Sequence, residues 1–433
     1  MQVSVESGEG LERRLKVELP SEQVSSAVDQ RLQQLARSAK LPGFRPGKVP
    51  MKLVRKRYGA QVLEEVFGEQ VQSSFYEAIT QESLRPAGQP QVEPEIDVEA
   101  GRFAYVATFE VMPEVELATL EGRALKRPVC ELAESDLDAL IERLRDQHKT
   151  WTPVERAAAQ GDQLTISFAG TMDGEAFEGG SAADVELELG SGRMIPGFED
   201  GLIGATAGET RTLEVTFPEE YQVEALAGKP ASFEVTVSQV AEPTLPKVDG
   251  EFVKRFGIED GDVERFKNDV RENMARELKQ RLEARTKEAV MDLLMEVNPV
   301  EVPQALVRDE IGSMQEEMRR SVGAQGDGVQ LPDALFEEPA RRRVALGLII
   351  GELVKQQELK ADQDRVQAML DEMAATYENP QAVIDYYKAE RGRMAALEAA
   401  VLESQVVDLV LDQATVEDEQ TSFEALTNPG AAG

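Results

Sequence analysis

The sequence predicts a multidomain α+β protein, with an N-terminal α+β domain, a central β-rich domain and an all-α C-terminal domain. The chain has 433 residues, which is more than one hydrophobic core usually supports. Short alternating apolar segments and glycine-rich turns fill residues 151–242, a pattern typical of β structure. From Pro246 onward the apolar residues recur with helical spacing instead.

The N-terminal α+β domain is expected over residues 1–112. Alternating apolar residues predict four strands, at Gln2–Val5, Leu15–Leu19, Gln91–Val98 and Phe103–Val111. Apolar residues at helical spacing predict one amphipathic helix that begins at Ser21 and a second over about residues 50–83. The strands and helices follow one another in blocks, as they do in an α+β domain.

Residues 113–150 are expected to connect this domain to the rest of the chain and to contain one helix around Leu137–Leu144. The β-rich domain follows over residues 151–242. Its predicted strands are Leu164–Gly170, Val185–Gly190, Thr210–Phe217 and Ala231–Val240.

Residues 243–412 are expected to be almost entirely helical. A long amphipathic helix runs from Val263 to about Glu296, and Pro299 and Pro303 separate it from the next one. Further helices are predicted at roughly residues 303–320, 333–357, 362–377, 380–392 and 394–411. The tail, residues 413–433, is acidic and then rich in small residues, so we expect it to be disordered.

The composition limits where the protein works. No apolar run reaches the roughly eighteen residues of a membrane-spanning helix. The first residues, Met1–Glu9, lack the basic and apolar regions of a secretory signal. A single cysteine, Cys130, fits a reducing compartment. We therefore expect a cytoplasmic protein that has no membrane partner.

The composition also limits the chemistry. With one histidine, His148, and one cysteine, a His/Cys zinc site or a Cys/His dyad is not credible. The polar residues around His148 suggest a solvated helix end rather than a Ser-His-Asp triad. Neither of the two common glycine patterns for phosphate binding occurs, and no pair stands out among the 81 acidic residues. The sequence predicts no cofactor and no metal.

A basic segment contrasts with the acidic rest of the chain. Nine basic and no acidic residues lie between Gln30 and Leu63, although the formal net charge is −34. At its centre, the glycines and prolines of Gly43–Pro50 predict a tight exposed turn that presents Phe44, Arg45 and Lys48. A solvated basic face is the simpler interpretation. The segregation from acids and the aromatic at the tip favour binding to a polyanion.

The β-rich segment contains the most specific pattern in the chain. Its elements are, in order, Asp162, Phe168-Ala169-Gly170, Asp173-Gly174, Phe177-Glu178-Gly179-Gly180, Leu189–Glu199, Gly204, Gly208, Phe217–Tyr221 and Phe233–Val235. This pattern resembles the FK506-binding-protein (FKBP) class of peptidyl-prolyl isomerases over about ninety residues. Such an enzyme needs an apolar cup rather than an acid, a base or a metal, because the twisted transition state loses the charge separation of the planar amide.

The resemblance implies a set of site residues. They are Phe168, Phe177, Glu178, Met194, Ile195, Phe198, Tyr221 and Phe233. In the family, the backbone N–H at the position of Ile195 holds the substrate carbonyl, and a hydroxyl corresponding to that of Tyr221 adds a second hydrogen bond. Phe198 stands where many members have tryptophan, and Glu178 where many have aspartate. The simpler interpretation makes the aromatic residues plain core of a small β domain.

Together with that domain, the turn Gly43–Lys48 resembles the ribosome-docking signature of the bacterial trigger factor family, and the domain order is also that family's. The resemblance covers essentially the whole chain. It implies docking on the large ribosomal subunit beside the exit tunnel, with Phe44, Arg45 and Lys48 contacting ribosomal protein and rRNA. It also implies binding of nascent and unfolded polypeptides, a weak homodimer off the ribosome, and packing of residues 113–150 with the C-terminal helices.

The helical region adds a feature that suits a chaperone. Pairs of methionines four residues apart place adaptable side chains on one helix face, at Met291 and Met295, Met314 and Met318, and Met369 and Met373. Such faces suit promiscuous binding of apolar segments, although ordinary core packing explains each methionine equally well.

Three hypotheses follow. The first is a ribosome-associated chaperone with prolyl isomerase activity, which explains both motifs. The second is a free isomerase whose flanking domains only recruit substrates. The third is a nucleic-acid-binding protein that uses the basic turn, against which the net charge of −34 argues.

Overall fold

The computed structural model describes residues 1–38, 44, 49–97, 100–221, 223, 225–322, 331–375, 377 and 379–428. The chain divides into two compact units. The first holds Met1–Pro128 and Ala284–Glu419, and the second holds Val129–Glu283 and the residues from Gln420 onward. Each unit therefore joins segments that are far apart in the sequence, and the long helix α5 (Val263–Val297) contributes to both.

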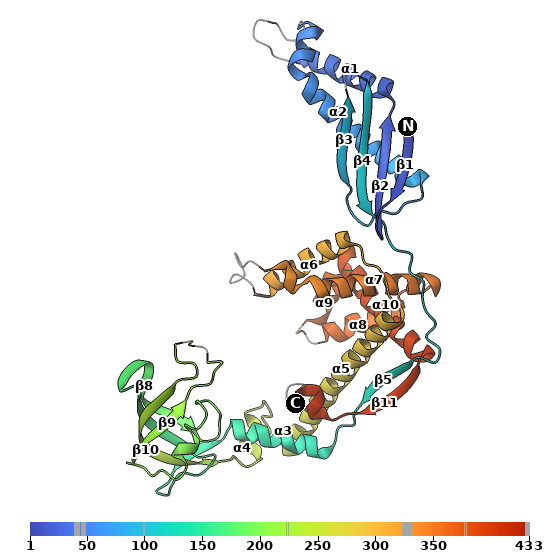
Figure 1. The fold of residues 1–433 in the computed structure, drawn as a ribbon. Coiled ribbons are helices and arrows are strands. Elements are labelled where there is room, and N and C mark those ends of the chain that lie inside the picture. Colours follow the sequence, from blue (N-terminus) through green and yellow to red (C-terminus); the bar gives the residue numbers. More distant parts are fainter. Residues whose placement is uncertain are drawn as a thin grey trace. The chain divides into compact units, whose positions relative to one another are not determined.

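The N-terminal part of the first unit is a four-stranded antiparallel sheet packed with two helices (Figure 1). The strand order is β1-β2-β4-β3, and the strands are β1 (Gln2–Ser7), β2 (Glu12–Leu19), β3 (Gln91–Asp97) and β4 (Arg102–Glu110). The helices are α1 (Ser21–Ser38) and α2 (Met51–Gln81). The six elements predicted for residues 1–112 are confirmed.

The core of this domain lies between the sheet and its helices. Strand β2 buries every second residue, Leu15, Val17 and Leu19, because alternate side chains of a strand point to the same face. These residues pack with β4 and with the apolar face of α2, from which Phe67 and Phe75 come. Burial of each such side chain contributes about 1.5–3 kcal/mol, so this face fixes the two helices on the sheet.

The rest of the first unit is mainly helical, as predicted. It contains the end of α5 and α6 (Gln304–Val322), α7 (Glu337–Gln356), α8 (Gln363–Ala374), α9 (Pro380–Lys388) and α10 (Arg391–Gln413). Strands β5 (Ala124–Val129) and β11 (Thr415–Gln420) pair with each other as a two-stranded ribbon. Leu120 and Leu125 of the connector are buried in a core made by α5, α7 and α10.

The β-rich part of the second unit is a five-stranded antiparallel sheet. The strand order is β6-β10-β7-β8, and β9 pairs with the first half of β10 on the edge opposite β7. The strands are β6 (Thr150–Pro153), β7 (Gln163–Met172), β8 (Glu175–Glu188), β9 (Thr210–Thr216) and β10 (Pro230–Thr244). Four of these overlap the predicted strands, and β6 was not predicted.

Strand β8 is much longer than predicted. It begins at Glu175 rather than at Val185, directly after the turn residues Asp173 and Gly174, whose φ angles are +49° and +85°. Two consecutive residues with positive φ make the tight turn that matches the twist of a hairpin, and Asp-Gly is well suited to it. The β7-β8 hairpin brings Phe177 onto the same sheet as Phe168.

The remainder of the second unit is a small helical core. It contains α3 (Glu134–Gln147), α4 (Gly250–Lys254), the start of α5 and α11 (Phe423–Thr427). His148 follows α3 directly and lies edge-on to Phe252 and Phe256, with ring centroids 6.3 Å and 5.4 Å away. His148 thus stands at a helix end with Asp146 and Gln147 exposed before it, as predicted, but aromatic rings half-bury the imidazole itself.

The prediction that the tail from residue 413 is disordered is also wrong over the described residues up to 428. Strand β11 pairs with β5, and α11 buries Phe423 and Leu426 among α3, α4 and α5. Ser422 caps α11 by accepting the N–H of Ala425 at 3.2 Å. The acidic composition concealed these contacts, because each depends on a partner that is distant in the sequence.

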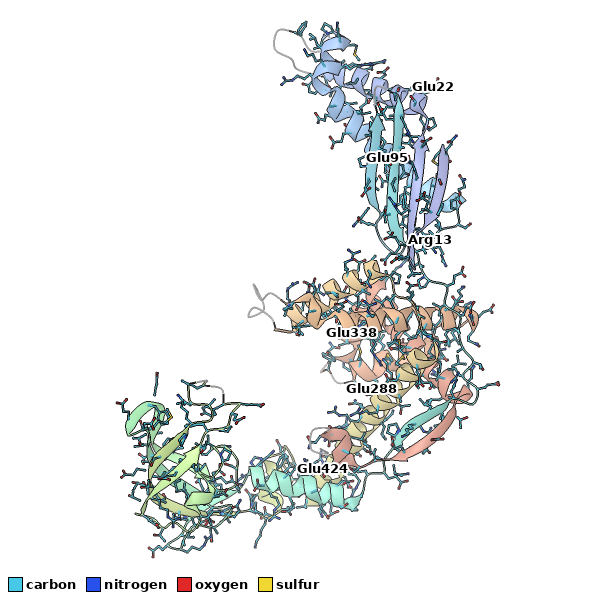
Figure 2. All side chains as sticks on the ribbon, viewed as in Figure 1. Arg13, Glu22, Glu95, Glu288, Glu338 and Glu424 are labelled. Atoms are coloured by element: carbon cyan, nitrogen blue, oxygen red, sulfur yellow. The ribbon has the colours of Figure 1, made fainter. Side chains whose placement is uncertain are left out.

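Charge is spread over the whole molecule. Acidic side chains occur on both units, as Figure 2 shows for Glu22, Glu95, Glu288, Glu338 and Glu424. The longest apolar stretch, in α7, falls short of a membrane span, as does every other helix in the described part of the chain.

Candidate functional site

The β-rich domain contains an open pocket of about 410 Å³, which we call the aromatic cup. All eight site residues predicted from the sequence line it, namely Phe168, Phe177, Glu178, Met194, Ile195, Phe198, Tyr221 and Phe233. They are spread over 66 positions of sequence, from 168 to 233, and the fold brings them together. Seven further residues that the sequence pattern did not mark as site residues line the cup too, namely Gly179, Arg193, Pro196, Phe217, Pro218, Val223 and Leu226.

Three neighbouring strands supply the floor of the cup. Phe168 comes from β7, Phe177 from β8 and Phe233 from β10. Glycines opposite these rings make room for them. A Cβ on Gly170 would lie 2.5 Å from the Phe233 ring, and one on Gly180 would lie 2.8 Å from the Phe177 ring. The two glycines of the sequence pattern therefore have a packing role: they let aromatic rings lie across the sheet.

Phe233 is the centre of the aromatic cluster. Its ring centroid lies 5.4 Å from that of Phe198 and 6.0 Å from those of Phe168 and Phe177, in edge-to-face arrangements. Each such pair contributes about 0.5–1.5 kcal/mol beyond the area it buries. The cluster is therefore both core and pocket wall, so the two interpretations offered for these aromatics are compatible.

A tight turn carries the next group of cup residues. The N–H of Phe198 donates to the carbonyl of Ile195 at 3.1 Å, and Gly197 has a φ of +88°. Proline at the second position and glycine at the third are what a type II turn requires, and Pro196-Gly197 supplies both. The turn buries Phe198, which is 2% exposed, and leaves Met194 and Ile195 half-buried at the pocket.

Two hydrogen-bonding groups at the cup are unpaired within the described part of the chain. The hydroxyl of Tyr221 and the N–H of Ile195 have no hydrogen-bond partner among the described residues. The Tyr221 ring is half-buried against Phe217, with centroids 4.8 Å apart, so the ring is fixed while its hydroxyl is available. Glu178 and Arg193 are exposed at the rim. The cup thus combines apolar walls, two available donors and a charged rim.

Glu199, next to Phe198, is a buried carboxylate that holds the loop beside the cup. Its Oε2 accepts the N–H groups of Gly190 at 2.7 Å and Gly192 at 3.2 Å. Its Oε1 accepts the N–H of Met194 at 3.1 Å and the hydroxyl of Ser191 at 3.2 Å. Burial by itself would raise the pKa of Glu199, but the N–H groups of Met194, Gly192 and Gly190 outweigh it and lower the pKa.

The second candidate site is the end of the N-terminal domain where α1 finishes and α2 begins, which we call the docking end. Phe44 is 42% exposed there, and Arg45 and Lys48 lie outside the described residues. Two more apolar side chains, Met51 and Leu53, are exposed in the first turn of α2.

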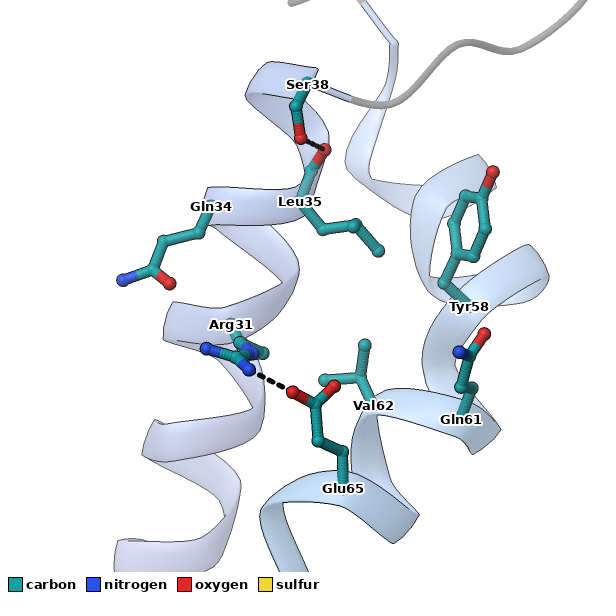
Figure 3. Close-up of a pocket in the computed structure, with 8 residues that line it drawn as sticks. All are labelled: Arg31, Gln34, Leu35, Ser38, Tyr58, Gln61, Val62 and Glu65. Carbon is teal, nitrogen blue, oxygen red and sulfur yellow. Dashed lines mark hydrogen bonds and ion pairs between the residues drawn. The ribbon is translucent and has the colours of Figure 1, made fainter.

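Ion pairs join the two helices below the docking end. Arg31 of α1 pairs with Glu65 of α2, and Asp29 of α1 pairs with Arg55 of α2. Figure 3 shows the Arg31–Glu65 pair beside a pocket of about 420 Å³ that opens between the helices, with Leu35, Tyr58 and Val62 in its walls. The pairs cross-link the helices and occupy two of the described bases, Arg31 and Arg55.

Four bases of the docking end are exposed without an ion-pair partner among the described residues, namely Arg37, Lys52, Lys56 and Arg57. They lie at the end of α1 and in the first two turns of α2. Positive charge with exposed apolar side chains is suited to a mixed surface of phosphate and protein.

The methionine faces predicted in the helical region divide between core and surface. Met291 is buried, whereas Met318 is 44% exposed near the end of α6. Met295 and Met314 are half-buried against the core that Phe336 and Ala340 form. Most of these side chains therefore pack in cores, as the simpler interpretation holds.

Comparisons with known proteins agree with this geometry. Residues 154–238 match the family model described as FKBP-type peptidyl-prolyl cis-trans isomerase. The domain that carries the aromatic cup is therefore an isomerase domain of the FKBP type. Residues 1–144 match the model described as bacterial trigger factor protein, and residues 262–412 match the model of its C-terminus.

The chain is also similar to whole proteins. It is 50% identical over 434 residues to the trigger factor of Thioalkalivibrio sulfidiphilus strain HL-EbGR7, covering 100% of this chain and 99% of that relative. It is 48% identical over 432 residues to that of Pseudomonas paraeruginosa strain DSM 24068 / PA7, with the same coverage. A solved structure of a trigger factor chaperone shares 18% identity and covers 95% of this chain and 100% of its own, with a TM-score of 0.49.

The chain therefore belongs to the trigger factor family. It is a molecular chaperone with a ribosome-binding N-terminal domain and an FKBP-type peptidyl-prolyl isomerase domain.

Proposed function

We propose that this chaperone docks on the large ribosomal subunit beside the exit tunnel through Phe44, Arg45 and Lys48, where it contacts ribosomal protein and rRNA. There it isomerises X-Pro bonds of nascent chains in the aromatic cup. The observation that carries the isomerase part is the convergence of eight residues, predicted from sequence alone, on one pocket of about 410 Å³.

The chemistry of the cup follows from the amide bond. Rotation about an X-Pro bond has to break amide resonance, with a barrier of about 18–20 kcal/mol. The planar amide separates charge and is well hydrated, whereas the twisted transition state has less charge separation. Apolar walls that exclude water therefore favour the twisted state over the planar one.

Each group of the cup has a part in this proposal. The rings of Phe168, Phe198 and Phe233 enclose the proline ring of the substrate. The free N–H of Ile195 donates to the carbonyl oxygen of the substrate and the Tyr221 hydroxyl donates a second hydrogen bond, so the substrate is held while the bond twists. Glu178, exposed at the rim, meets residues that flank the proline.

The docking part is supported by charge and exposure. Four described bases at the docking end have no ion-pair partner among the described residues, and Phe44, Met51 and Leu53 are exposed beside them. Phosphates of rRNA attract the bases, while Phe44 meets an apolar surface of a ribosomal protein.

Ribosome co-sedimentation tests the docking part. Changing Phe44, Arg45 and Lys48 together to alanine should weaken binding by about thirtyfold or more, because an anchor at a binding hot spot contributes about 2 kcal/mol. A matched control changes Tyr76, Arg14 and Arg102 to alanine, which removes one exposed aromatic and two bases elsewhere in the same domain. Wild-type affinity of the first variant would disprove docking through these residues.

The same experiment separates the rival hypotheses. A free isomerase would sediment without ribosomes at every salt concentration. A general nucleic-acid binder would bind naked RNA as tightly as ribosomes, with a steep salt dependence.

We further propose four working parts of the chain, 1–112 for docking, 113–150 as a connector, 151–242 for isomerisation and 243–412 for holding unfolded polypeptides. Separate hydrophobic cores support this division, and Leu120 and Leu125 support packing of the connector with the helices. We also propose that the protein works in the cytoplasm and forms a weak homodimer off the ribosome. The single cysteine supports the first of these two points.

A further inference from the structure

Two carboxylates are buried among the described residues of the β-rich domain, and they have different surroundings. Glu199 is 8% exposed, and all its hydrogen bonds go to the loop Gly190–Met194 beside the cup. Asp162 is 2% exposed and is held by the guanidinium of Arg156 and the N–H of Ala159. Asp162 does not line the cup. The first carboxylate therefore holds the loop itself. The side chain of the second holds the adjoining turn, whose backbone meets Leu189 just before that loop, so it makes a nearby control.

The loop that Glu199 holds has few other restraints. Ser191, Gly192 and Arg193 are exposed, and Gly190 and Gly192 have φ angles of +93° and +67°. Among the described residues, the N–H groups of Gly192 and Met194 donate only to Glu199. A segment with two glycines and so few contacts needs an anchor to keep a single conformation.

We propose that Glu199 is a positioning residue for the isomerisation, an inference that rests on the function proposed above. Its carboxylate takes the N–H groups of alternate residues, 190, 192 and 194, and so fixes the path of the backbone up to Ile195. The N–H of Ile195 is left without an acceptor among the described residues. That N–H is thereby held at the cup for the carbonyl oxygen of the substrate, and the Met194 side chain is held beside it.

The substitution Glu199→Gln tests this geometry because it changes one oxygen into a donor. Placed at the Oε2 position, the amide NH₂ would face the N–H groups of both Gly190 and Gly192. Placed at the Oε1 position, it would face the N–H of Met194 and could donate to the Ser191 hydroxyl. The second orientation costs less free energy, because it loses one backbone hydrogen bond instead of two. It still breaks the hydrogen bond of Met194, the residue directly before Ile195.

Two further variants act as controls. Asp162→Asn removes the other buried carboxylate of the same domain without touching a residue that lines the cup. Ser191→Ala removes only the side-chain donor and leaves three backbone N–H groups on Glu199. The first control measures what general destabilisation of the domain does to activity, and the second measures what one weak contact to Glu199 does.

Isomerisation of a short X-Pro peptide by the full-length chain is the main readout. We expect Glu199→Gln to lower kcat/KM by about tenfold to a hundredfold, since misplacement of a reacting group by about 1 Å has effects of this size. The loss should fall mainly on kcat, because the apolar walls that bind proline remain. Asp162→Asn and Ser191→Ala should stay within about twofold of wild type, once the folded fraction is matched by its unfolding curve.

Amide hydrogen exchange is the second readout, and it does not depend on activity. In the wild type, the N–H groups of Gly190, Gly192 and Met194 should be protected, and Glu199→Gln should remove protection from Met194 first. If Glu199→Gln does not fold, Glu199→Asp, which is one methylene shorter, replaces it in both measurements and should show a smaller loss of the same kind.

The outcomes separate this inference from the proposed function. An inactive wild type in which these amides are protected would disprove the isomerase function alone. An active wild type with unprotected loop amides, or with Glu199→Gln as active as wild type, would overturn the positioning role. Equal losses in Glu199→Gln and Asp162→Asn at matched stability would overturn it too, because the effect would then be structural.

Discussion

The aromatic cup and the docking end show two different ways of building a site. The cup is concave, and its residues come from three strands, a turn and a loop that the sheet holds in place. The docking end is formed by one continuous stretch of chain at the ends of two helices, with exposed bases and an exposed Phe44. Packing defines the cup, whereas charge and sequence proximity define the docking end.

This difference has consequences for what disturbs each site. A cup works by excluding water and by shape, so it should respond to changes of core volume and hardly to salt. Bases that meet phosphates should respond to salt and hardly to the packing of another domain. Four experiments test this contrast.

The largest effect is expected from Phe233→Ala. This ring is buried and meets Phe168, Phe177 and Phe198, so its removal should destabilise the β-rich domain by about 3–5 kcal/mol and abolish isomerase activity. Ribosome binding should stay as in wild type. Phe109→Ala, in the core of the N-terminal domain, should have the reverse effect. Denaturant unfolding measures the stability of both variants, and peptide isomerisation and ribosome co-sedimentation measure their two activities. Loss of both activities in either variant would contradict the contrast.

Salt comes next. If only Arg45 and Lys48 each neutralise one phosphate, a fourfold rise in salt should weaken ribosome binding by about tenfold, since each contact contributes a slope of about −0.7 to −0.9, and contacts of the other bases should increase this loss. The kcat/KM for a neutral X-Pro peptide should change by less than about twofold. Parallel salt dependence of the two activities would show that charge acts at the cup as well.

Tyr221→Phe should have a moderate effect on the cup alone. The substitution keeps the ring that packs on Phe217 and removes a hydroxyl with no partner among the described residues, so stability should not fall. Loss of one hydrogen bond to the substrate is worth about 0.5–1.5 kcal/mol, which lowers kcat/KM by about twofold to tenfold. Steady-state kinetics with the unfolding midpoint as a control decide this, and an unchanged kcat/KM would remove Tyr221 from the mechanism.

The smallest effect is expected from lowering the pH, which changes the free energy of unfolding of the β-rich domain. Burial raises the pKa of Asp162, but Arg156 and the N–H of Ala159 outweigh it, so the pKa is lowered on folding. A lowered folded pKa means that the stabilisation is present above the pKa of the unfolded chain, about 3.9, and is lost as the pH falls through the folded value. The difference in unfolding free energy between wild type and Asp162→Asn should therefore be constant from pH 7 to 5 and shrink below about pH 4.

Asp162 lies in the β-rich domain, whereas the docking end belongs to another domain with its own core. Ribosome binding should therefore not follow the acid-dependent loss in the β-rich domain. An unfolding free-energy difference that grew on acidification would mean that Asp162 is stabilised in its protonated form, contrary to its contacts with Arg156 and Ala159.

Much of the fold could be predicted because local patterns specify it. Alternation in Leu15–Leu19 and helical spacing from Ser21 gave the correct elements, since one face of each element is buried in the same core. The cup residues could be named because their spacing follows a known pattern. Phe217 was quoted in that pattern but not assigned to the site, although an aromatic at a strand end directly before Pro218 was the signal available.

Other elements could not be read from local sequence. Strand β6 is short and carries Pro153, so it resembles a loop, and only pairing with β10 makes it a strand. Half of the residues of strand β11 are acidic and most are exposed, and α11 has five residues. The role proposed for Glu199 was equally hidden, because a glutamate in a loop gives no sign that four donors will converge on it.

The two strands of the β5-β11 ribbon are synthesised at different times. Arg127 of β5 and Asp418 of β11 form an ion pair although 291 positions separate them, so one edge of the ribbon is translated long before the other. The docking domain, complete by residue 112, can fold early during synthesis, because domains fold as units from the N-terminus. The ribbon can close only after β11 has been translated as well. A chaperone of this family thus depends, for the folding of its own chain, on a strand that is synthesised long after its partner.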